Sequence, residues 1–440
     1  MFKLCLLTSC LLVTSLIYAQ SQQHGVKFSD YEYQKVPKRY FSVRGTRELE
    51  KSHSLKEYCP RPLNQLDYNT SPGWATSYAA FTILTAYQNK WSGNEITKKA
   101  YSPIYPYFQA KHDLSLGCTE DVSLFEVLQV LKDQGTPLYT QLPSRCIDKV
   151  HTNTKTDAWF HKISEFARLF DVSDGQQKKI TAIKTTLSEN VPVIAAMHLP
   201  ASFHYAKEFW QPREKFSREL PVHVLCVVGY DDEKYGGAFE VMNSWGSEWG
   251  NDGFMWIRYD DFIEFTRYAM DLYVIPGRTE GLELGGSIEL NLMDDQPMDI
   301  SLTEPGYYKI ARSYPSGTIF TIKVKNQSPA FVYAFASDLT GEIYSFFPPG
   351  FTSAAFAKAS SFYVPDEFTP IEIDETLGTD YLCVLFSKED LDINSVFEKI
   401  KFGDGSFGDK VKLALNQNLI PVNDIKYLNN QISFTVANSS

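Results

Sequence analysis

The sequence predicts an α+β domain followed by an all-β domain, and three features carry this prediction. Apolar residues recur at helical spacing in residues 71–87 and 122–135. Residues 223–242 form two apolar runs joined by a polar, glycine-containing loop, which indicates a β-hairpin. Beyond residue 318, short apolar runs separated by turn residues are typical of a β-sandwich. The chain of 440 residues is long enough for both domains.

The charge balance excludes two classes of partner. The formal net charge is -11, the isoelectric point is about 5.3, and the chain contains no basic run. An acidic chain without basic clusters is repelled by phosphate backbones and by anionic lipids. We therefore expect neither nucleic acid nor an anionic membrane surface as a partner.

The N-terminus predicts export. A short basic start, Met1–Lys3, precedes a largely apolar run, Leu4–Tyr18, and Ala19 follows. This order predicts a signal peptide over residues 1–19, and hence a secreted protein in the periplasm, at the cell surface or outside the cell. Lipoprotein cleavage at Cys10 is the alternative, but the apolar run before Cys10 is too short for it. No other stretch approaches the roughly 20 apolar residues that span a bilayer, so we expect no transmembrane segment.

Five cysteines remain once the signal peptide is removed, namely Cys59, Cys118, Cys146, Cys226 and Cys383. An exported chain permits disulfides, but five is an odd number. Cys118 and Cys146 flank one helical segment and form the candidate pair, whereas Cys226 lies in an apolar strand and is interpreted as a buried thiol. No CxxC or His-rich spacing indicates a metal, and we expect no cofactor.

The first domain begins with a polar segment and a helix. Residues 20–58 are polar and mixed in charge, and are interpreted as a short leader or linker. The helix that follows starts at Ser71, which suits an N-cap, with Pro72 at the first helical position. The helix continues to Tyr87. Backbone N–H groups and the positive dipole end converge at such a start, where they stabilise an anion.

Further elements lie between this helix and the end of the first domain. Residues 122–135 predict an amphipathic helix that a glycine ends, and residues 180–187 predict another helix. The runs that predict strands on either side of the hairpin are Val191–Met197, Phe254–Tyr259 and Met270–Ile275.

The hairpin carries the first candidate site residues. His223 and Asn243 are 20 residues apart, so with a turn centred on Glu233 we expect them to lie directly opposite each other, with Cβ atoms roughly 5 Å apart. An Asn carbonyl that accepts from one ring nitrogen fixes the tautomer and aims the other nitrogen outward, as nucleophilic catalysis requires. A structural histidine beside a glycine-rich turn is the alternative interpretation.

The residues after Asn243 add a longer motif. They read Asn243-Ser244-Trp245-Gly246-x-x-Trp249-Gly250-x-x-Gly253-Phe254, with His223 at its distance upstream. This string resembles the His and Asn segments of the papain-family (C1) cysteine peptidases. The resemblance implies a two-lobed papain-like fold, a helical lobe plus a β lobe, over residues 59–276. It also implies that Trp245 shields the His/Asn contact from water, and that a peptide or protein is the substrate or ligand.

The resemblance extends to the start of the helix. The family has Gln six residues before its nucleophilic Cys, and here Gln65 precedes Ser71 by six. The implied catalytic set is Gln65, Ser71, His223 and Asn243, with Ser in place of Cys. An alternative alignment matches Trp74-Ala75 to the family's Trp-Ala and puts Gly73 at the nucleophile.

Two other segments depart from the family pattern. Gly117-Cys118 resembles the start of the family's GCNGG motif, but Glu120-Asp121 replaces its second glycine pair, so any cleft would have an altered wall. Papain relatives usually carry a longer helical propeptide that blocks the cleft until it is removed. The leader over residues 20–58 is too short for that role.

The exchange of sulfur for oxygen leaves two functions open. The pKa of a thiol falls from about 8.5 to about 3 to 4 beside a protonated histidine, so the sulfur is already a thiolate at neutral pH. A serine hydroxyl is not ionised in this way, and Ser71 would need His223 to remove its proton during attack. We expect reduced or lost peptidase activity. The alternatives are a serine-dependent peptidase, with Gln65 and the Ser71 N–H holding the oxyanion, and a pseudopeptidase that binds a peptide or protein.

Residues 277–290 are rich in Gly and charge and predict a linker to a β-sandwich over residues 291–440. Residues 332–348 resemble an uncharacterised β-domain appended to bacterial secreted or signalling enzymes. No catalytic set stands out there, and the partner of this domain is unknown.

Asp294-Asp295 and Asp390–Asp392 are interpreted as solvated acidic turns, with calcium ligands as the alternative. The predicted strands are Thr318–Val324, Ala330–Ala336, Ile343–Phe347, Ser361–Val364, Tyr381–Phe386 and Ile432–Val436.

Overall fold

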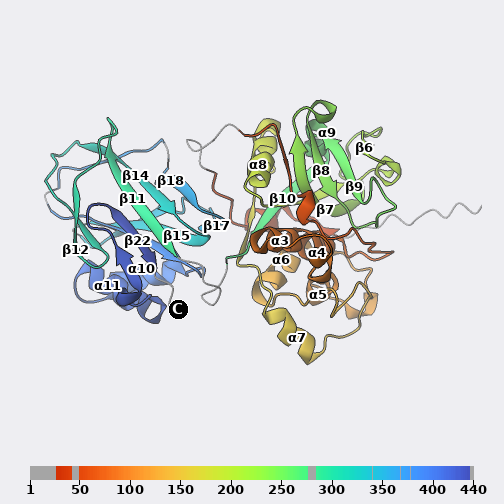
Figure 1. The fold of residues 1–440 in the computed structure, drawn as a ribbon, viewed down its shortest axis with the longest axis horizontal. Coiled ribbons are helices and arrows are strands. Elements are labelled where there is room, and N and C mark those ends of the chain that lie inside the picture. Colours follow the sequence, from red (N-terminus) through yellow and green to blue (C-terminus); the bar gives the residue numbers. More distant parts are fainter. Residues whose placement is uncertain are drawn as a thin grey trace, which may run out of the picture.

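The computed structural model describes residues 26–41, 49–275 and 284–436, except 339, 367 and 377. The predicted signal peptide, residues 1–19, and the first half of the predicted linker, residues 277–283, lie outside the described residues. Figure 1 shows two bodies side by side, with the first domain on the right and the C-terminal domain on the left. The first domain has a helical lobe and a β lobe, which is the α+β, two-lobed architecture that the papain resemblance implies.

One long helix, from Ser71 to Asn89, lies at the centre of the first domain. It consists of α2 (Ser71–Gly73), a π-helical stretch over Trp74–Phe81 and α3 (Thr82–Asn89), and it ends where Lys90 turns left-handed at φ 55°. All residues from 71 to 86 are buried. Small side chains such as Ala79 and Ala80 allow this close packing, because they let neighbouring backbones approach the helix.

Four further helices complete the helical lobe. In α6 the buried face includes Leu124, Val127, Leu128 and Leu131, which confirms the amphipathic helix that the sequence predicts. Gly135 follows this helix at φ 77°, where a side chain is disfavoured. Cys118 and Cys146, the pair that the sequence predicts, form a disulfide in this lobe. The helices are α4 (Asn94–Lys98), α5 (Ile104–Gln109), α6 (Leu124–Asp133) and α7 (Thr152–Trp159).

The β lobe is an eight-stranded sheet in the order β4-β10-β5-β7-β8-β9-β6, with β2 also paired to β7. Its central strands are apolar and buried on both faces, because helices α8 (Gln176–Ser188) and α9 (Tyr259–Phe265) and the long helix cover the sheet. The strands are β2 (Ser52–Ser54), β4 (Glu165–Arg168), β5 (Val193–His198), β6 (Phe209–Trp210), β7 (Val222–Asp231), β8 (Ala238–Met242), β9 (Phe254–Arg258) and β10 (Thr266–Tyr273).

Residues 26–41 are built into this domain, although the sequence assigns them to a leader. Strand β1 (Val26–Lys27) pairs in parallel with β3 (Val122–Ser123), which directly precedes α6 in the chain. Helix α1 (Asp30–Gln34) follows, and Ser29 caps its N-terminus by accepting from the Glu32 N–H. The leader therefore contributes secondary structure to the first domain.

The C-terminal domain packs two antiparallel sheets face to face, as the predicted β-sandwich requires. One sheet has the order β18-β14-β11-β22-β21, with β19 beside β14, and the other joins β16, β17 and β20 to β15. All six predicted runs are strands. Residues 285–290, which the sequence assigns to the linker, are part of β11 and pair with β14. Because these residues are rich in glycine and charge, their pattern does not predict a strand.

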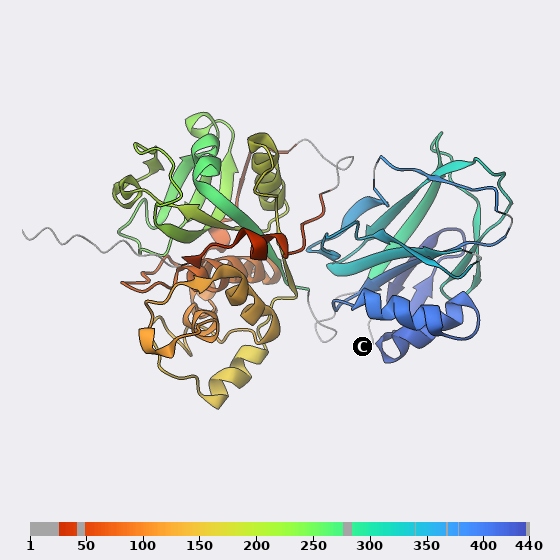
Figure 2. The same ribbon diagram turned by 180° about the vertical axis from the view of Figure 1, so that it is seen from behind.

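The sequence also does not predict the two helices of this domain. Figure 2 shows α10 (Ile393–Phe402) and α11 (Phe407–Leu415) lying against the sandwich. The strands are β11 (Gly285–Leu292), β12 (Ile300–Glu304), β13 (Tyr307–Ile310), β14 (Ile319–Asn326), β15 (Ala330–Ser337), β16 (Ile343–Phe347), β17 (Ala355–Phe356), β18 (Ser360–Val364), β19 (Ile371–Glu372), β20 (Tyr381–Ser387), β21 (Ile425–Tyr427) and β22 (Ile432–Val436).

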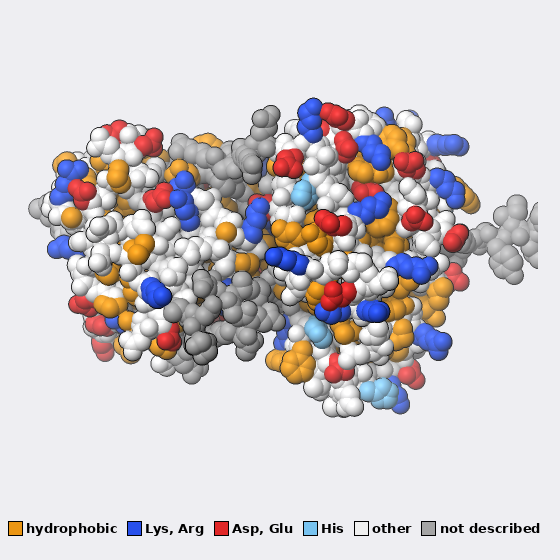
Figure 3. Space-filling view, viewed as in Figure 1, with side chains coloured by type: hydrophobic (Ala, Val, Ile, Leu, Met, Phe, Trp, Pro, Cys, Tyr) orange, Lys and Arg blue, Asp and Glu red, His pale blue; other side chains and the backbone are white. Residues whose placement is uncertain are grey.

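On the face in Figure 3, acidic and basic side chains are interspersed. Among the helices of the described ranges, none combines the length and the apolar character that crossing a bilayer needs.

Candidate active site

His223 and Asn243 meet at the edge of the hairpin. The Nε2 atom of His223 lies 2.7 Å from Oδ1 of Asn243, and each residue is only 3% exposed. The expectation that they lie directly opposite is wrong, because Cys226 pairs with Met242 and the ladder puts Asn243 two residues out of step with His223. The cause is the loop, which is not centred on Glu233, because Asp231 pairs with Ala238. A bulge between Val227 and Gly229 recovers one residue of the resulting offset. The side chains of His223 and Asn243 reach each other across this two-residue offset.

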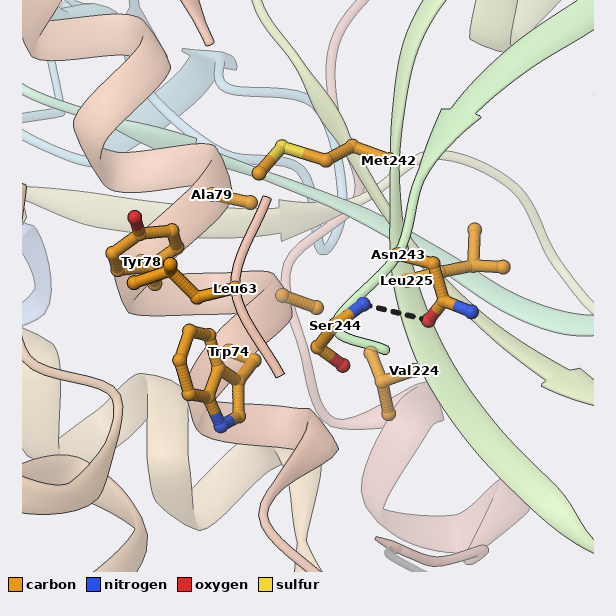
Figure 4. Close-up of a pocket in the computed structure, with 10 residues that line it drawn as sticks. Leu63, Trp74, Tyr78, Ala79, Val224, Leu225, Met242, Asn243 and Ser244 are labelled. Atoms are coloured by element: carbon orange, nitrogen blue, oxygen red, sulfur yellow. Dashed lines mark hydrogen bonds between the residues drawn. The ribbon is translucent and has the colours of Figure 1, made fainter. Parts of the chain in front are cut away.

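The hydrogen bonds fix the tautomer of His223. Oδ1 of Asn243 can only accept, and it also accepts from the backbone N–H of Ser244 at 2.8 Å, as the dashed line in Figure 4 shows. The proton of the neutral imidazole must therefore lie on Nε2, which leaves Nδ1 unprotonated. This is the base-plus-orienter arrangement that the sequence suggests.

Burial governs the protonation of this pair. Desolvation lowers the pKa of His223 to about 4, and only the hydrogen bond to Asn243 opposes this effect. The charge of the nearby His204 is a smaller cause of the same lowering, and the pKa of about 4 includes it. The imidazole is therefore neutral at pH 7.

Aromatic rings cover the His223–Asn243 contact. The ring of Trp245 lies 4.9 Å from that of His223, and His204 stacks on Trp245 at 4.5 Å with an interplanar angle of 6°. Trp249 and Phe203 pack behind them. The role of His204 is not predicted from the sequence, because nothing in its local pattern distinguishes it from a loop histidine.

Ser71 lies beside the strand residue that follows His223. Its Oγ accepts a hydrogen bond from the Val224 N–H at 3.4 Å, and its exposed fraction is 0%. The hydrogen bonds of the described residues include none between Ser71 and His223. Ser71 is also not the N-cap that the sequence predicts: Thr70 takes that position and Ser71 is the first helical residue. Prediction of a helix boundary from Ser-Pro alone is uncertain by one residue.

Packing leaves no room for a side chain at Gly73, the nucleophile position in the alternative alignment. A Cβ on Gly73 would lie 2.0 Å from the carbonyl oxygen of Pro103. No side chain fits there, so of the two candidate positions only Ser71 has room for a reactive group.

Gln65 is held by hydrogen bonds on both sides of its amide. Its Oε1 accepts from the Ser244 hydroxyl at 2.6 Å, and its Nε2 donates to the Tyr68 carbonyl at 2.7 Å. Its backbone N–H donates to the Ser244 carbonyl at 2.7 Å. Leu66, the next residue, is held at φ 60°, a strained conformation for leucine. Gln65 is thereby fixed next to Asn243, and one of its two amide hydrogens is already used.

A small cavity lies next to Asn243 and Ser244, between the long helix and the sheet. Figure 4 shows the side chains that line a cavity of about 10 Å³, with Asn243 and Ser244 on one wall and Trp74 and Tyr78 on the other. A single water occupies about this volume. The described residues also contain no cluster of three or more His, Cys, Asp or Glu that could hold a metal ion.

Two family models match this chain. The model "Papain family cysteine protease" matches residues 97–270, a range that includes His223 and Asn243 but begins after Ser71. A second model, "Domain of unknown function (DUF4384)", matches residues 313–390.

Curated relatives match over short stretches. Cathepsin B-like cysteine proteinase 1 of Ostertagia ostertagi is 30% identical over 79 residues, which cover 18% of this chain and 23% of the relative. Cysteine proteinase 3 of Entamoeba histolytica is 30% identical over 91 residues, covering 20% of this chain and 29% of the relative. The chain thus spans less than a third of the length of either relative.

Solved structures of cysteine proteases are also similar to this chain. Xylellain, a cysteine protease from Xylella fastidiosa, is 18% identical with a TM-score of 0.46, covering 58% of this chain and 97% of the other. Digestive procathepsin L2 from the Tenebrio molitor larval midgut is 15% identical with a TM-score of 0.47, covering 57% and 78%. From these matches, residues 97–270 are similar to the papain family of cysteine proteases and residues 313–390 are similar to the DUF4384 domain.

Proposed function

We propose that this protein is an exported pseudopeptidase, a papain-family homologue that has lost covalent peptide hydrolysis and binds a peptide or protein instead. One observation carries the proposal. By its spacing from Gln65, Ser71 stands in for the family's nucleophile; its hydroxyl accepts from the Val224 N–H, and none of the described hydrogen bonds links it to His223. The hydroxyl proton is therefore not held by the base that would have to remove it.

The protonation chemistry supports the same conclusion. A serine hydroxyl must lose its proton to a base as it attacks, and an efficient base has a pKa near the working pH. Burial lowers the pKa of His223 to about 4, so it is a weak base at neutral pH. A cysteine would depend less on the strength of this base, because a thiol ionises far more readily than a hydroxyl.

Two features support export. The first 19 residues have the order of a signal peptide. The disulfide between Cys118 and Cys146 suits an oxidising compartment, where such bonds persist.

Serine-dependent hydrolysis is the second candidate. The retained His223–Asn243 bond and the anchored Gln65 favour it. In that mechanism Ser71 attacks the acyl carbon, His223 takes the proton and returns it to the leaving group, and Asn243 orients His223. Gln65 and the Ser71 N–H would hold the oxyanion.

Turnover of a fluorogenic peptide by wild type, Ser71→Ala and Ser71→Cys separates the two candidates. For a pseudopeptidase, wild type matches Ser71→Ala, and a fluorophosphonate probe does not label Ser71. Because His223 and Asn243 are still hydrogen-bonded, we expect Ser71→Cys to gain thiol-dependent activity that His223→Ala abolishes. Wild-type turnover that is lost in Ser71→Ala would refute the pseudopeptidase. Ligand binding is measured separately, as a rise in melting temperature with peptide mixtures.

A further inference from the structure

The segment from Pro37 to Arg39 lies between the two domains and pairs with both. The backbone of Lys38 forms a parallel bridge with Arg168 of the first domain and another with Thr352 of the C-terminal domain. Figure 2 shows the red N-terminal segment passing from the lobes of the first domain toward the C-terminal domain. One short stretch of chain therefore serves as a neighbouring strand to both domains.

On the first-domain side this stretch covers a sheet edge. The Arg39 N–H donates to the Arg168 carbonyl at 2.8 Å, and the Arg168 N–H donates to the Pro37 carbonyl at 2.9 Å. Arg168 belongs to β4, the outermost strand of the eight-stranded sheet. An uncovered edge strand presents unpaired N–H and C=O groups, so the segment satisfies groups that β4 would otherwise expose.

On the C-terminal side the same residues make a second set of bonds. The Lys38 N–H donates to the Phe351 carbonyl at 3.0 Å, and the Ser353 N–H donates to the Lys38 carbonyl at 2.8 Å. The Tyr40 ring then packs edge-on against Phe347 at 5.1 Å and against other aromatic rings of the sandwich core. This aromatic ring of the N-terminal segment is thus part of the core of the other domain.

The preceding residues are anchored in the first domain. Tyr33 has an exposed fraction of 0%, stacks on Tyr268 at 4.5 Å and donates its hydroxyl proton to the Phe170 carbonyl at 2.8 Å. Phe28 packs against His198 and Tyr268. Removal of these side chains would open the core, because their neighbours are packed around them.

Buried charges fix the segment further. Arg39 pairs with Asp271, whose side chain is fully buried, and with Glu189. Lys38 pairs with Asp171 at 2.6 Å. If Arg39 left, Asp271 would remain as a buried carboxylate without its cation, which strongly opposes release of the segment.

We propose that residues 26–41 are a permanent interdomain staple and not a removable leader. The segment completes the core of the first domain, covers the edge of β4 and holds the C-terminal domain in place. It stays bound even when the chain behind it is cut. This inference does not depend on the chemistry of Ser71, so its failure and that of the pseudopeptidase proposal are separate.

The test is a cut behind the segment in the full-length protein. A recognition sequence for a site-specific protease replaces residues 43–48, which lie outside the described part of the chain, and the purified protein is cleaved. We expect the N-terminal fragment to co-elute with the rest of the chain in native size-exclusion chromatography and to separate only in denaturant. Separation under native conditions, with an unchanged melting temperature of the remaining chain, would overturn the staple.

Two variants of α1 in the cleavable protein show where retention comes from. Tyr33→Ala removes the buried ring, and we expect the cut fragment to dissociate about 100-fold faster or more. Tyr31→Ala is the matched control, because Tyr31 lies on the same helix and is 68% exposed. Equal dissociation rates for the two variants would contradict the proposed anchoring. The co-elution test on the unmutated chain still applies if Tyr33→Ala does not fold.

Discussion

The imidazole of His223 donates to the side chain of Asn243 across 2.7 Å, although the two residues are out of step in the strand pairing. Asn243 Oδ1 is held in turn by the Ser244 N–H, and Ser244 binds Gln65. None of these bonds involves Ser71. The orientation of the histidine is therefore independent of the Ser71 side chain.

Protonation of His223 should destabilise the fold in acid. Because burial lowers its pKa from 6.5 to about 4, the unfolded chain binds a proton more readily than the folded chain between these values. The stabilisation is complete above pH 6.5 and is lost as the pH falls toward 4. The lost free energy of unfolding is about 3 kcal/mol at most.

Urea unfolding at pH 7 and pH 4.5 measures this effect in wild type and His223→Gln. The variant keeps a donor for Asn243 but does not titrate, so its free energy of unfolding should fall less. Other buried histidines contribute equally to both proteins and cancel in the comparison. An equal loss of unfolding free energy in wild type and in His223→Gln would show that His223 is not the titrating group.

Trp245→Ala should raise the pKa of His223. Desolvation is the largest cause of the low pKa, and Trp245 covers the imidazole at 4.9 Å. Admitting water moves the pKa of His223 up toward 6.5. An NMR titration of the His223 ring protons measures the shift, and Trp159→Ala, at an exposed tryptophan of the helical lobe, is the control. No difference between the two variants would mean that other groups exclude the water.

Breaking the disulfide should lower stability by about 3 to 4 kcal/mol. The bond closes a loop with a sequence separation of 28 between Cys118 and Cys146, and loop entropy in the unfolded chain gives this magnitude. The denaturation midpoint of a Cys118→Ser, Cys146→Ser double variant measures it. Cys59→Ser, which removes a free thiol, is the control. A double variant as stable as this control would argue against the loop contribution.

Gly73→Ala should be severely destabilising. The added Cβ meets the Pro103 carbonyl oxygen at 2.0 Å, so the start of the long helix and α5 must move apart. Overpacking of this kind costs about 1 to 3 kcal/mol or more. Gly175→Ala is the control because nothing lies within 4 Å of its added Cβ. Thermal melting of both variants makes the comparison, and similar melting temperatures would show that the helix start tolerates a side chain.

The sequence predicts the parts of this molecule that depend on local pattern. The amphipathic helix at Leu124–Asp133, the six short strands of the sandwich and the contact between the His223 and Asn243 side chains all follow from periodicity or motif. The exact register of the hairpin does not, because composition fixes neither the centre of the loop nor the bulge at Val227/Gly229.

The role of residues 26–41 could not be predicted, since their polar composition hides contacts with residues far away in the chain. Tyr33 and Tyr40 are single aromatic residues in a charged segment, and burial of each depends on surfaces formed by other elements. The hydrogen bond from the Val224 N–H to Ser71 is likewise a tertiary contact that no spacing rule encodes.

The double pairing of Lys38 constrains the order in which the molecule can be completed. One of its two neighbours, Thr352, is synthesised long after the rest of the first domain, yet Lys38 belongs to the earliest part of the chain. A domain normally folds as its own residues emerge, from the N-terminal side onward. Here the side of Lys38 that faces the C-terminal domain stays unpaired until the last quarter of the polypeptide is made, so a nascent chain stalled before Phe351 would present an open strand edge to chaperones and proteases.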